Sequence, residues 1–259
     1  MPCRFFKAMN DIAKFEVNDK LCIGCSRCIK VCPGHLLYLN EEYHCRRNIP
    51  DADHPCWRCQ HCLAVCPRGA IRIFNRDPED SRMPASKDDA SYILDSLIMT
   101  RRSHRRFLSR TVDSDMIRFL IDILSHAPNH ENRQTVQFAL IDRPEQMADI
   151  QDCLNASEPD PFCGAPCLLV PHSPAGEKYA EYDQVVAASY FELLCASRDL
   201  GAVIIPFPED AAAIREVLEI PPDHITSVMV GFGWPEIPYA RGVQRHVGDT
   251  RIHHPKTEH

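Results

Sequence analysis

The chain contains the stretch CIGCSRCIKVCP at residues 22–33 and, 34 positions later, the stretch CWRCQHCLAVCP at residues 56–67. Both follow the spacing Cys-x-x-Cys-x-x-Cys-x-x-x-Cys-Pro, so eight of the 14 cysteines belong to one pattern written twice. The repeat extends to two apolar positions between the cysteines, which are occupied by Ile29, Val31, Leu63 and Val65. Chance does not produce such a pattern, and the eight thiols are therefore predicted to share one function.

Thiolates in this spacing are typical ligands of [4Fe–4S] clusters. A Cys-x-x-Cys-x-x-Cys turn supplies three thiolates, and the cysteine before the proline ligates the other cluster in two-cluster ferredoxins. We therefore predict two clusters with crossed ligand sets. The first set is Cys22, Cys25, Cys28 and Cys66, and the second set is Cys56, Cys59, Cys62 and Cys32. In this pattern the N-terminal part of the chain resembles a bacterial two-cluster ferredoxin.

A zinc ribbon and a disulfide framework explain the cysteines less well. A zinc ribbon needs two C-x-x-C pairs, which leaves the last two cysteines of each run unexplained. The first 20 residues lack the apolar core of a signal peptide. Six further cysteines have no repeat partner, and we expect them to remain thiols in a reducing cytoplasm, several of them as small core residues. They are Cys3, Cys45, Cys153, Cys163, Cys167 and Cys195. Because an exposed cluster is sensitive to oxygen, we expect an anaerobic or microaerobic host.

At 259 residues the chain is longer than the cysteine pattern needs, because the repeat is complete near Phe74. Residues 76–90 carry many charges and two prolines, which is typical of an exposed linker. We therefore predict a ferredoxin domain at 1–75, a linker at 76–90 and a second domain at 91–259.

Charge and hydropathy exclude two classes of partner. Residues 1–90 carry 14 basic and 12 acidic side chains, whereas residues 91–259 carry 15 basic and 24 acidic ones. Neither part has the basic excess of a general nucleic-acid binder. No apolar run approaches the roughly 18 residues that a membrane helix needs. We therefore predict a soluble cytoplasmic protein without nucleic-acid or membrane partners.

The second domain is predicted to be α+β with layered helices and strands. Apolar residues recur with helical spacing over 114–126, and Asp113 or Ser114 is placed to cap that helix. A longer helix is predicted over 180–200, with Gly201 as its left-handed C-terminal residue. Strands are predicted at Gln137–Ile141, Cys167–Pro171, Ala202–Ile205 and Thr226–Phe232. Neither a Rossmann nor a P-loop phosphate motif is present.

The densest polar stretch in this domain is RRSHRRF at residues 101–107, which follows an apolar helical stretch. Four guanidinium groups and a serine hydroxyl are suited to bind a phosphate group, because arginine can contact two phosphate oxygens at once. The same residues would also suit a solvated basic helix end that interacts with the helix dipole.

The order of three segments resembles the nitroreductase family of FMN flavoproteins. These are residues 101–107, the helix over 114–126 and the turn APNHENRQ at 127–134, which correspond to the family patterns R-R-S-x-R-x-F and A-P-S-x-x-N-x-Q. The resemblance covers 91–247 and implies an α/β sandwich that forms a homodimer with FMN at the subunit interface. It assigns FMN contacts to Arg101, Arg102, Ser103, Arg105, Pro128, Asn129, Asn132, Gln134 and a late arginine, Arg241 or Arg245, of which Arg241 is favoured.

The resemblance implies an FMN-dependent oxidoreductase. Electrons from an external low-potential donor would pass through the clusters to FMN and reduce a small electron-poor acceptor such as a nitroaromatic or a quinone. No catalytic side chain is assigned, because the cofactor carries the chemistry.

The chain departs from the family at Pro206 and Pro208, where many members offer a backbone N–H to the flavin, and proline has none. This departure favours the alternative of a non-enzymatic electron-transfer or redox-sensing protein. A third hypothesis is a domain that has lost FMN and serves as a scaffold. Cys163 and Cys167 could form a redox pair, although core packing beside a strand is the favoured interpretation.

Overall fold

The computed structural model describes residues 15–47, 56–153, 160–208 and 211–245. The chain forms two compact units. The first consists of Met1–Ala85 together with Glu131–Arg133, and the second of Ser86–His130 and Gln134–His259. The linker predicted at 76–90 contains a short 3-10 helix at Pro78–Asp80, and its last four residues belong to the helix α3 (Lys87–Thr100).

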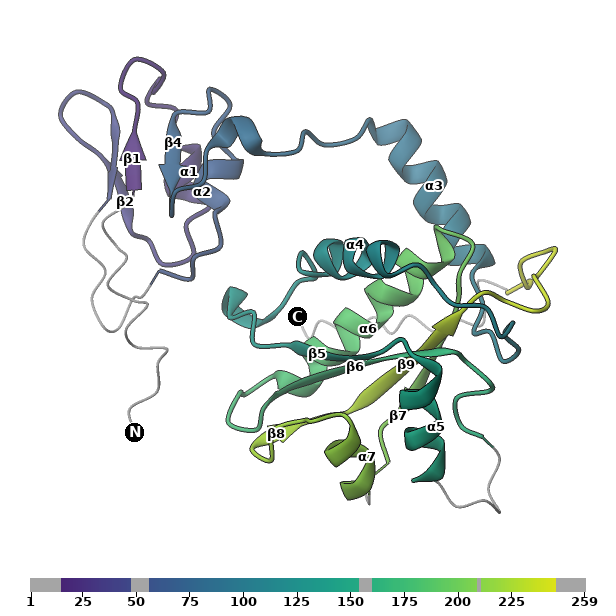
Figure 1. Ribbon diagram of the computed structural model, residues 1–259. Helices are drawn as coiled ribbons and strands as arrows, with labels where there is room; N and C mark the ends of the chain where they lie inside the picture. Colours follow the sequence, from purple (N-terminus) through teal and green to yellow (C-terminus); the bar gives the residue numbers. More distant parts are fainter. Residues whose placement is uncertain (1–14, 48–55, 154–159, 209–210, 246–259) are drawn as a thin grey trace, which may run out of the picture. The chain divides into compact units, whose positions relative to one another are not determined.

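The first unit is built from two small antiparallel sheets and two one-turn helices (Figure 1). One sheet pairs β1 (Phe15–Val17) with β4 (Ile71–Ile73), and the other pairs β2 (Leu37–Leu39) with β3 (Cys45–Arg47). The helices are α1 (Arg27–Lys30) and α2 (His61–Ala64). Each strand that precedes a cysteine run thus pairs with the strand that follows the other run. The unit has a core of its own, to which Leu37, Leu63 and Ile71 belong.

The sequence repeat of this unit is also a repeat of backbone conformation. Left-handed residues occur in pairs that are 34 positions apart, at Gly24 and Arg58, Ser26 and Gln60, and His35 and Gly69. A non-glycine residue in this region costs roughly 1–2 kcal/mol. At Gly24 a side chain would also clash, because a Cβ atom would lie 2.7 Å from the carbonyl oxygen of Tyr43. The first two pairs allow the backbone to turn sharply between cysteines, and the third pair follows the last cysteine of each run.

The second unit is built on one five-stranded sheet with antiparallel pairings. The order is β5-β6-β9-β7, with β8 paired to β6. The strands are β5 (Gln137–Ile141), β6 (Cys167–Pro174), β7 (Gly201–Pro206), β8 (His224–Ile225) and β9 (Val228–Gly233). Side chains alternate between two cores, as the pleat of a strand requires. In β6, Cys167 and Leu169 face one core, and Leu168 and Val170 face the other.

Helices cover both faces of this sheet (Figure 1). The core on one face contains side chains of α4 (Ser114–Leu124) and α6 (Ala180–Ala196). The core on the other face contains side chains of α5 (Pro144–Asp152) and α7 (Ala212–Val217). The predicted α+β class is confirmed, as is the strand Gln137–Ile141. Among the described residues, no helix has the length and apolar character needed to cross a bilayer.

Helix ends and strand breaks differ in part from the sequence prediction. Asp113 caps α4, because its side chain accepts the N–H groups of Asp115 and Met116. The prediction of Gly201 as a left-handed helix end is wrong, since Gly201 begins β7 and the left-handed residue is Asp199. The strand predicted at 226–232 begins only at Val228. The preceding residue, Ser227, donates its N–H to the side-chain oxygen of Gln184 instead.

We expect Gly201→Ala to destabilise the fold. A Cβ atom at this position would lie 2.7 Å from Cγ of His104, and overpacking of this kind costs about 1–3 kcal/mol. Gly176 is the matched control, because nothing lies within 4 Å of a Cβ atom built there. Urea denaturation should show the loss for Gly201→Ala and a change within about 0.5 kcal/mol for Gly176→Ala. Equal effects of both substitutions would contradict the packing argument.

Candidate functional site

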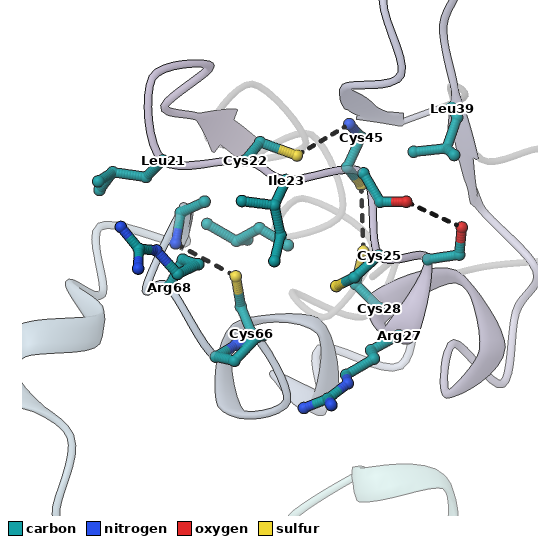
Figure 2. A pocket seen from close by; sticks show the side chains of 15 residues that line it. Leu21, Cys22, Ile23, Cys25, Arg27, Cys28, Leu39, Cys45, Cys66 and Arg68 are labelled. Atoms are coloured by element: carbon teal, nitrogen blue, oxygen red, sulfur yellow. Dashed lines mark hydrogen bonds between the residues drawn. The ribbon is translucent and has the colours of Figure 1, made fainter.

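The first predicted set of cysteines lines one cavity of the N-terminal unit (Figure 2). Three of its sulfurs come from the loop and first turn of helix at 22–28, and the fourth comes from the end of the second run. The cavity is lined by Cys22, Cys25, Cys28 and Cys66, with Cys45 as a fifth thiol. The structure therefore brings together the four residues of the first crossed set.

The second predicted set lines a second cavity of the same unit. Its thiols are Cys32, Cys56, Cys59 and Cys62. Phe15, Leu37 and Ile73 contribute apolar surface, and Arg47 contributes a guanidinium group. That these eight residues are cluster ligands stays a prediction, but the grouping of the thiols is the crossed one.

Backbone N–H groups point at several of these sulfurs. The N–H of Leu36 donates to Sγ of Cys32 at 3.4 Å, and the N–H of Ala70, 34 residues later, donates to Sγ of Cys66 at 3.2 Å. The N–H of Cys45 donates to Sγ of Cys22 at 3.5 Å. Such donors favour the charged thiolate over the thiol.

Burial acts in the opposite direction on the second set. It raises the pKa of the Cys62 thiol to about 12 and is also the main cause of the raised pKa of Cys59. These thiols would therefore hold their protons at neutral pH until a metal displaces them. Among the described residues, no three His, Cys, Asp or Glu side chains converge closely enough for one metal ion. A [4Fe–4S] cube is larger and takes each thiolate at a separate iron atom.

Cys45 is buried beside the first set. Its Sγ lies 3.4 Å from Sγ of Cys28. The hydrogen bond between the two lowers the pKa of Cys28 to about 6, and the same contact, together with burial, raises the pKa of Cys45. Cys45 is therefore the member of the pair that keeps its proton. Sequence reasoning gave it no role, because it lies outside the repeat.

In the second unit, the arginine run begins where α3 ends. Nη1 of Arg101 lies 2.8 Å from Oε1 of Glu192, which is almost completely buried in α6. Arg102 donates from Nη2 to the carbonyl oxygen of Met99, and its Nε is buried without a hydrogen-bond partner among the described residues. The arginines at 105 and 106 are exposed. Arg101 thus has its counterion within the unit, whereas Arg102 has a buried donor to offer.

The chain returns to this run after the last strand. Tyr239 donates from its hydroxyl to the carbonyl oxygen of Ser103 at 3.5 Å, and its ring lies 4.9 Å from that of His104. Gly242 packs on the end of α3, because a Cβ atom there would lie 2.9 Å from the Met99 carbonyl oxygen. Arg241 lies between these two contacts with an exposed side chain, and Arg245 is exposed a few residues further on. Exposure alone does not test the predicted FMN role of these two arginines, which stays a prediction.

The predicted turn at 127–134 has strained backbone. Asn129 shapes it by accepting the N–H of Gln134 at 2.9 Å and donating to the Ala127 carbonyl oxygen at 3.2 Å. Glu131, Asn132 and Gln134 all adopt positive φ angles. Non-glycine residues in such conformations cluster at functional sites. Pro128 and Gln134 are exposed, and Asn132 is grouped with the first unit.

The end of β7 offers no free backbone N–H over residues 206–208. Pro206 and Pro208 have none, and the N–H of Phe207 donates to the carbonyl oxygen of Ser227 at 3.0 Å. Cys167, one member of the candidate redox pair, is 1% exposed and packs in the core between the sheet and α6. The packing interpretation of Cys167 is therefore confirmed.

Comparison with known families identifies both parts of the chain. A 4Fe–4S dicluster domain matches residues 21–70. The nitroreductase family matches residues 98–161 and 152–234, which together make up just over half of the chain. The chain belongs to the nitroreductase family and carries a 4Fe–4S dicluster domain in front of the family domain.

Solved structures share the fold of the second unit. An FMN-dependent nitroreductase from Clostridium difficile R20291 is 19% identical with a TM-score of 0.54, over 62% of this chain and 98% of its own. A nitroreductase with bound FMN from Bacteroides fragilis NCTC 9343 is 16% identical with a TM-score of 0.54, and the match covers 62% of this chain and 98% of that one. An iodotyrosine deiodinase bound to FMN and 3-iodo-L-tyrosine is 19% identical with a TM-score of 0.53, and the match covers 63% of this chain and 100% of that one. A comparison with curated proteins finds no match.

Two polar residues of these sites were missed by the sequence analysis. Glu192 lies on the buried face of α6, and a lone carboxylate between apolar helix positions could have indicated a buried ion pair. Arg47 lies in β3, outside the repeat, and no motif points to it.

Anaerobically reconstituted protein should contain roughly eight iron and eight sulfide ions per chain. Cys32→Ser should remove mainly the cluster of the second set, because its sulfur lines that cavity. Cys25→Ser should affect mainly the other cluster. Metal analysis and electron paramagnetic resonance (EPR) spectra of the reduced variants test both points. Loss of the first cluster in Cys32→Ser would refute the crossed assignment, and about one zinc without sulfide would refute the clusters themselves.

Proposed function

We propose that the protein is an FMN-dependent oxidoreductase that takes electrons through two [4Fe–4S] clusters to FMN and reduces a small electron-poor acceptor such as a nitroaromatic or a quinone. The observation that carries the proposal is that one chain combines two cavities, each lined by one crossed set of four cysteines, with a nitroreductase-family domain. Its electron donor would be an external low-potential one-electron carrier. We place this chemistry in the cytoplasm.

The residues present fit both cofactors. The two crossed cysteine sets would hold the clusters. For FMN, the buried Nε of Arg102 lacks an acceptor, which a phosphate oxygen would supply. When bound, FMN supplies hydride and one-electron chemistry, and the clusters supply single electrons. A relative of the same fold contains FMN, which supports the assignment.

The structure suggests different roles for the two leading arginines. Arg101 pairs with buried Glu192 at 2.8 Å, so we propose that it fixes the end of α3 against α6. Arg102 is the stronger candidate for the phosphate, because its buried donor has no partner. Ser103 and Arg105 next to it, together with Arg241, would complete the anion site.

A homodimer is part of the proposal. No residue of α3 is buried, although the helix carries several large apolar side chains. Five of these side chains are at least half exposed: Tyr92, Ile93, Leu94, Ile98 and Met99. Exposed apolar patches of this kind mark interfaces between proteins. A second copy that covers α3 would remove this surface from water next to the arginine run.

We expect Arg102→Ala to lose FMN affinity about tenfold to a hundredfold, because removal of a charge-assisted hydrogen bond costs on the order of 1.5–3 kcal/mol. Arg106→Ala removes the same charge from an exposed side chain and serves as the control. Titration of flavin-free protein with FMN measures both affinities. The clusters should keep their absorption in each variant. Full affinity in Arg102→Ala would show that the phosphate binds elsewhere.

One observation favours a second candidate function, a non-enzymatic electron-transfer or redox-sensing protein. Residues 206–208 have no free N–H with which to contact a flavin, since Phe207 is already bonded to Ser227. A protein of this kind would exchange electrons with protein partners and react slowly with small acceptors.

Rapid mixing separates the two functions. If the clusters feed FMN, Cys59→Ser should slow flavin reduction by the external donor while leaving the reoxidation of photoreduced FMN by a nitroaromatic nearly unchanged. The reason is that Cys59 lines the second cysteine cavity, so its loss should remove a cluster and not FMN. Slow reoxidation of the unmodified protein by every small acceptor would favour the electron-transfer protein. Unchanged donor-driven turnover in Cys59→Ser would show that the clusters do not carry the electrons.

A further inference from the structure

Strand β3 contributes one side chain to each cysteine cavity. Successive side chains of a strand point to opposite faces, so Cys45 and Arg47 share the inner face and Arg46 lies on the outer one. Cys45 lines the first cavity, and Arg47 lines the second. Arg46 is turned to Asp19, with Nη1–Oδ1 and Nη2–Oδ2 distances of 2.8 and 2.9 Å. Of the two arginines, only Arg46 has a carboxylate partner among the described residues.

The guanidinium of Arg47 lacks the acceptors that a buried cation needs. Both Nη1 and Nη2 are buried without a hydrogen-bond partner in the described part of the chain. No carboxylate is among the described residues that line the second cavity, and the closest aromatic ring, that of Phe15, lies 5.8 Å from Cζ. This ring lies within the range of a cation–π contact, but it supplies neither a counterion nor a hydrogen-bond acceptor, and a buried charge without them is strongly unfavourable. The four thiols of this cavity point to the missing partner, because a cluster held by four thiolates is an anion.

The first cavity has no equivalent charge. Its β3 residue, Cys45, has a side chain that cannot carry a positive charge, and the Cys45 N–H contributes only a dipole, at 3.5 Å from Sγ of Cys22. Arg27 and Arg68 also line this cavity, but both are exposed and their guanidinium groups point away from the sulfurs (Figure 2). Water and salt screen exposed charges much more than buried ones.

We propose that Arg47 raises the reduction potential of the second cluster above that of the first, so that a single electron taken from the donor resides at the second cluster. This inference rests on the proposed function, because it requires that both cavities hold [4Fe–4S] clusters. The donor is oxidised by one electron and one cluster is reduced by one electron. No bond is formed or broken, and no proton moves. The added electron makes the cluster more negative, and a buried cation favours that state.

The expected size follows from electrostatics. At an effective dielectric constant of about 20, a unit charge about 10 Å away changes a one-electron equilibrium by at least tenfold. A tenfold change corresponds to about 59 mV for a one-electron couple. We therefore expect Arg47→Gln to lower the potential of the second cluster by at least about 59 mV. The potential of the first cluster should change much less.

An EPR-monitored redox titration of the full-length protein tests this. The two clusters are assigned by comparison with Cys25→Ser and Cys59→Ser. Arg46→Gln is the matched control, because it removes the same charge from the same strand, but from a residue that is paired with Asp19. Arg47→Lys should keep most of the difference between the clusters, because it keeps the charge. In the unmodified protein, one electron per chain should produce mainly the signal of the second cluster.

The outcomes separate this inference from the proposed function. If the unmodified protein assembles no iron and sulfide, the proposed function fails. If both clusters assemble and Arg47→Gln leaves their potentials unchanged, or shifts them equally, the role of Arg47 is refuted while the clusters stand. If Arg47→Gln does not assemble the second cluster, the test is the EPR spectrum of the unmodified protein after addition of one electron per chain. A signal mainly from the first cluster overturns the inference.

Discussion

The convergence of four sulfurs on each of two cavities is the constraint on which the N-terminal unit depends. A chain can bring three cysteines of one short run to a common point only if it turns sharply between them. It does so with left-handed residues at equivalent positions between the cysteines of both runs, and three of these four residues are not glycine. The fourth sulfur comes from the other run, and the strands pair in the same crossed way. Neither half could therefore form its cavity alone, and metal binding by these thiols would be coupled to folding.

The same constraint explains how much of the site could be predicted. Cysteine spacing follows the geometry of ligation, so the sequence alone predicted which four repeat cysteines line each cavity. The helices α4 and α6 and the strand β5 could be predicted for a similar reason. Burial of one face of a helix or strand requires apolar residues to recur with the period of that element. Long-range polar pairs follow no such period. The ion pair of Arg101 with Glu192 joins residues 91 positions apart, and the clash that excludes a side chain at Gly201 depends on His104.

The ion pair of Arg101 also changes how the arginine run is understood. Sequence reasoning treats neighbouring guanidinium groups as equivalent phosphate ligands, because their spacing contains no information about burial. In the structure one of them is neutralised by a buried carboxylate and another has an unpaired buried donor. A site that binds an anion gains from this arrangement, because the first arginine can fix the backbone without competing for the ligand. Pre-organisation of this kind lowers the entropic cost of binding.

The N-terminal unit contains two similar cysteine cavities, and the side chains of β3 make them different. Two equivalent cavities would hold an electron with equal preference, and electrons would then have no defined order of transfer between the clusters. β1 and β3 occupy related positions, each before one cysteine run and paired with the strand after the other. β1 carries apolar side chains at Phe15 and Val17, whereas β3 carries Cys45 and Arg47. The repeat forms two similar cysteine-lined cavities, and the side chains of Cys45 and Arg47 in β3 make the electrostatic surroundings of the two cavities different.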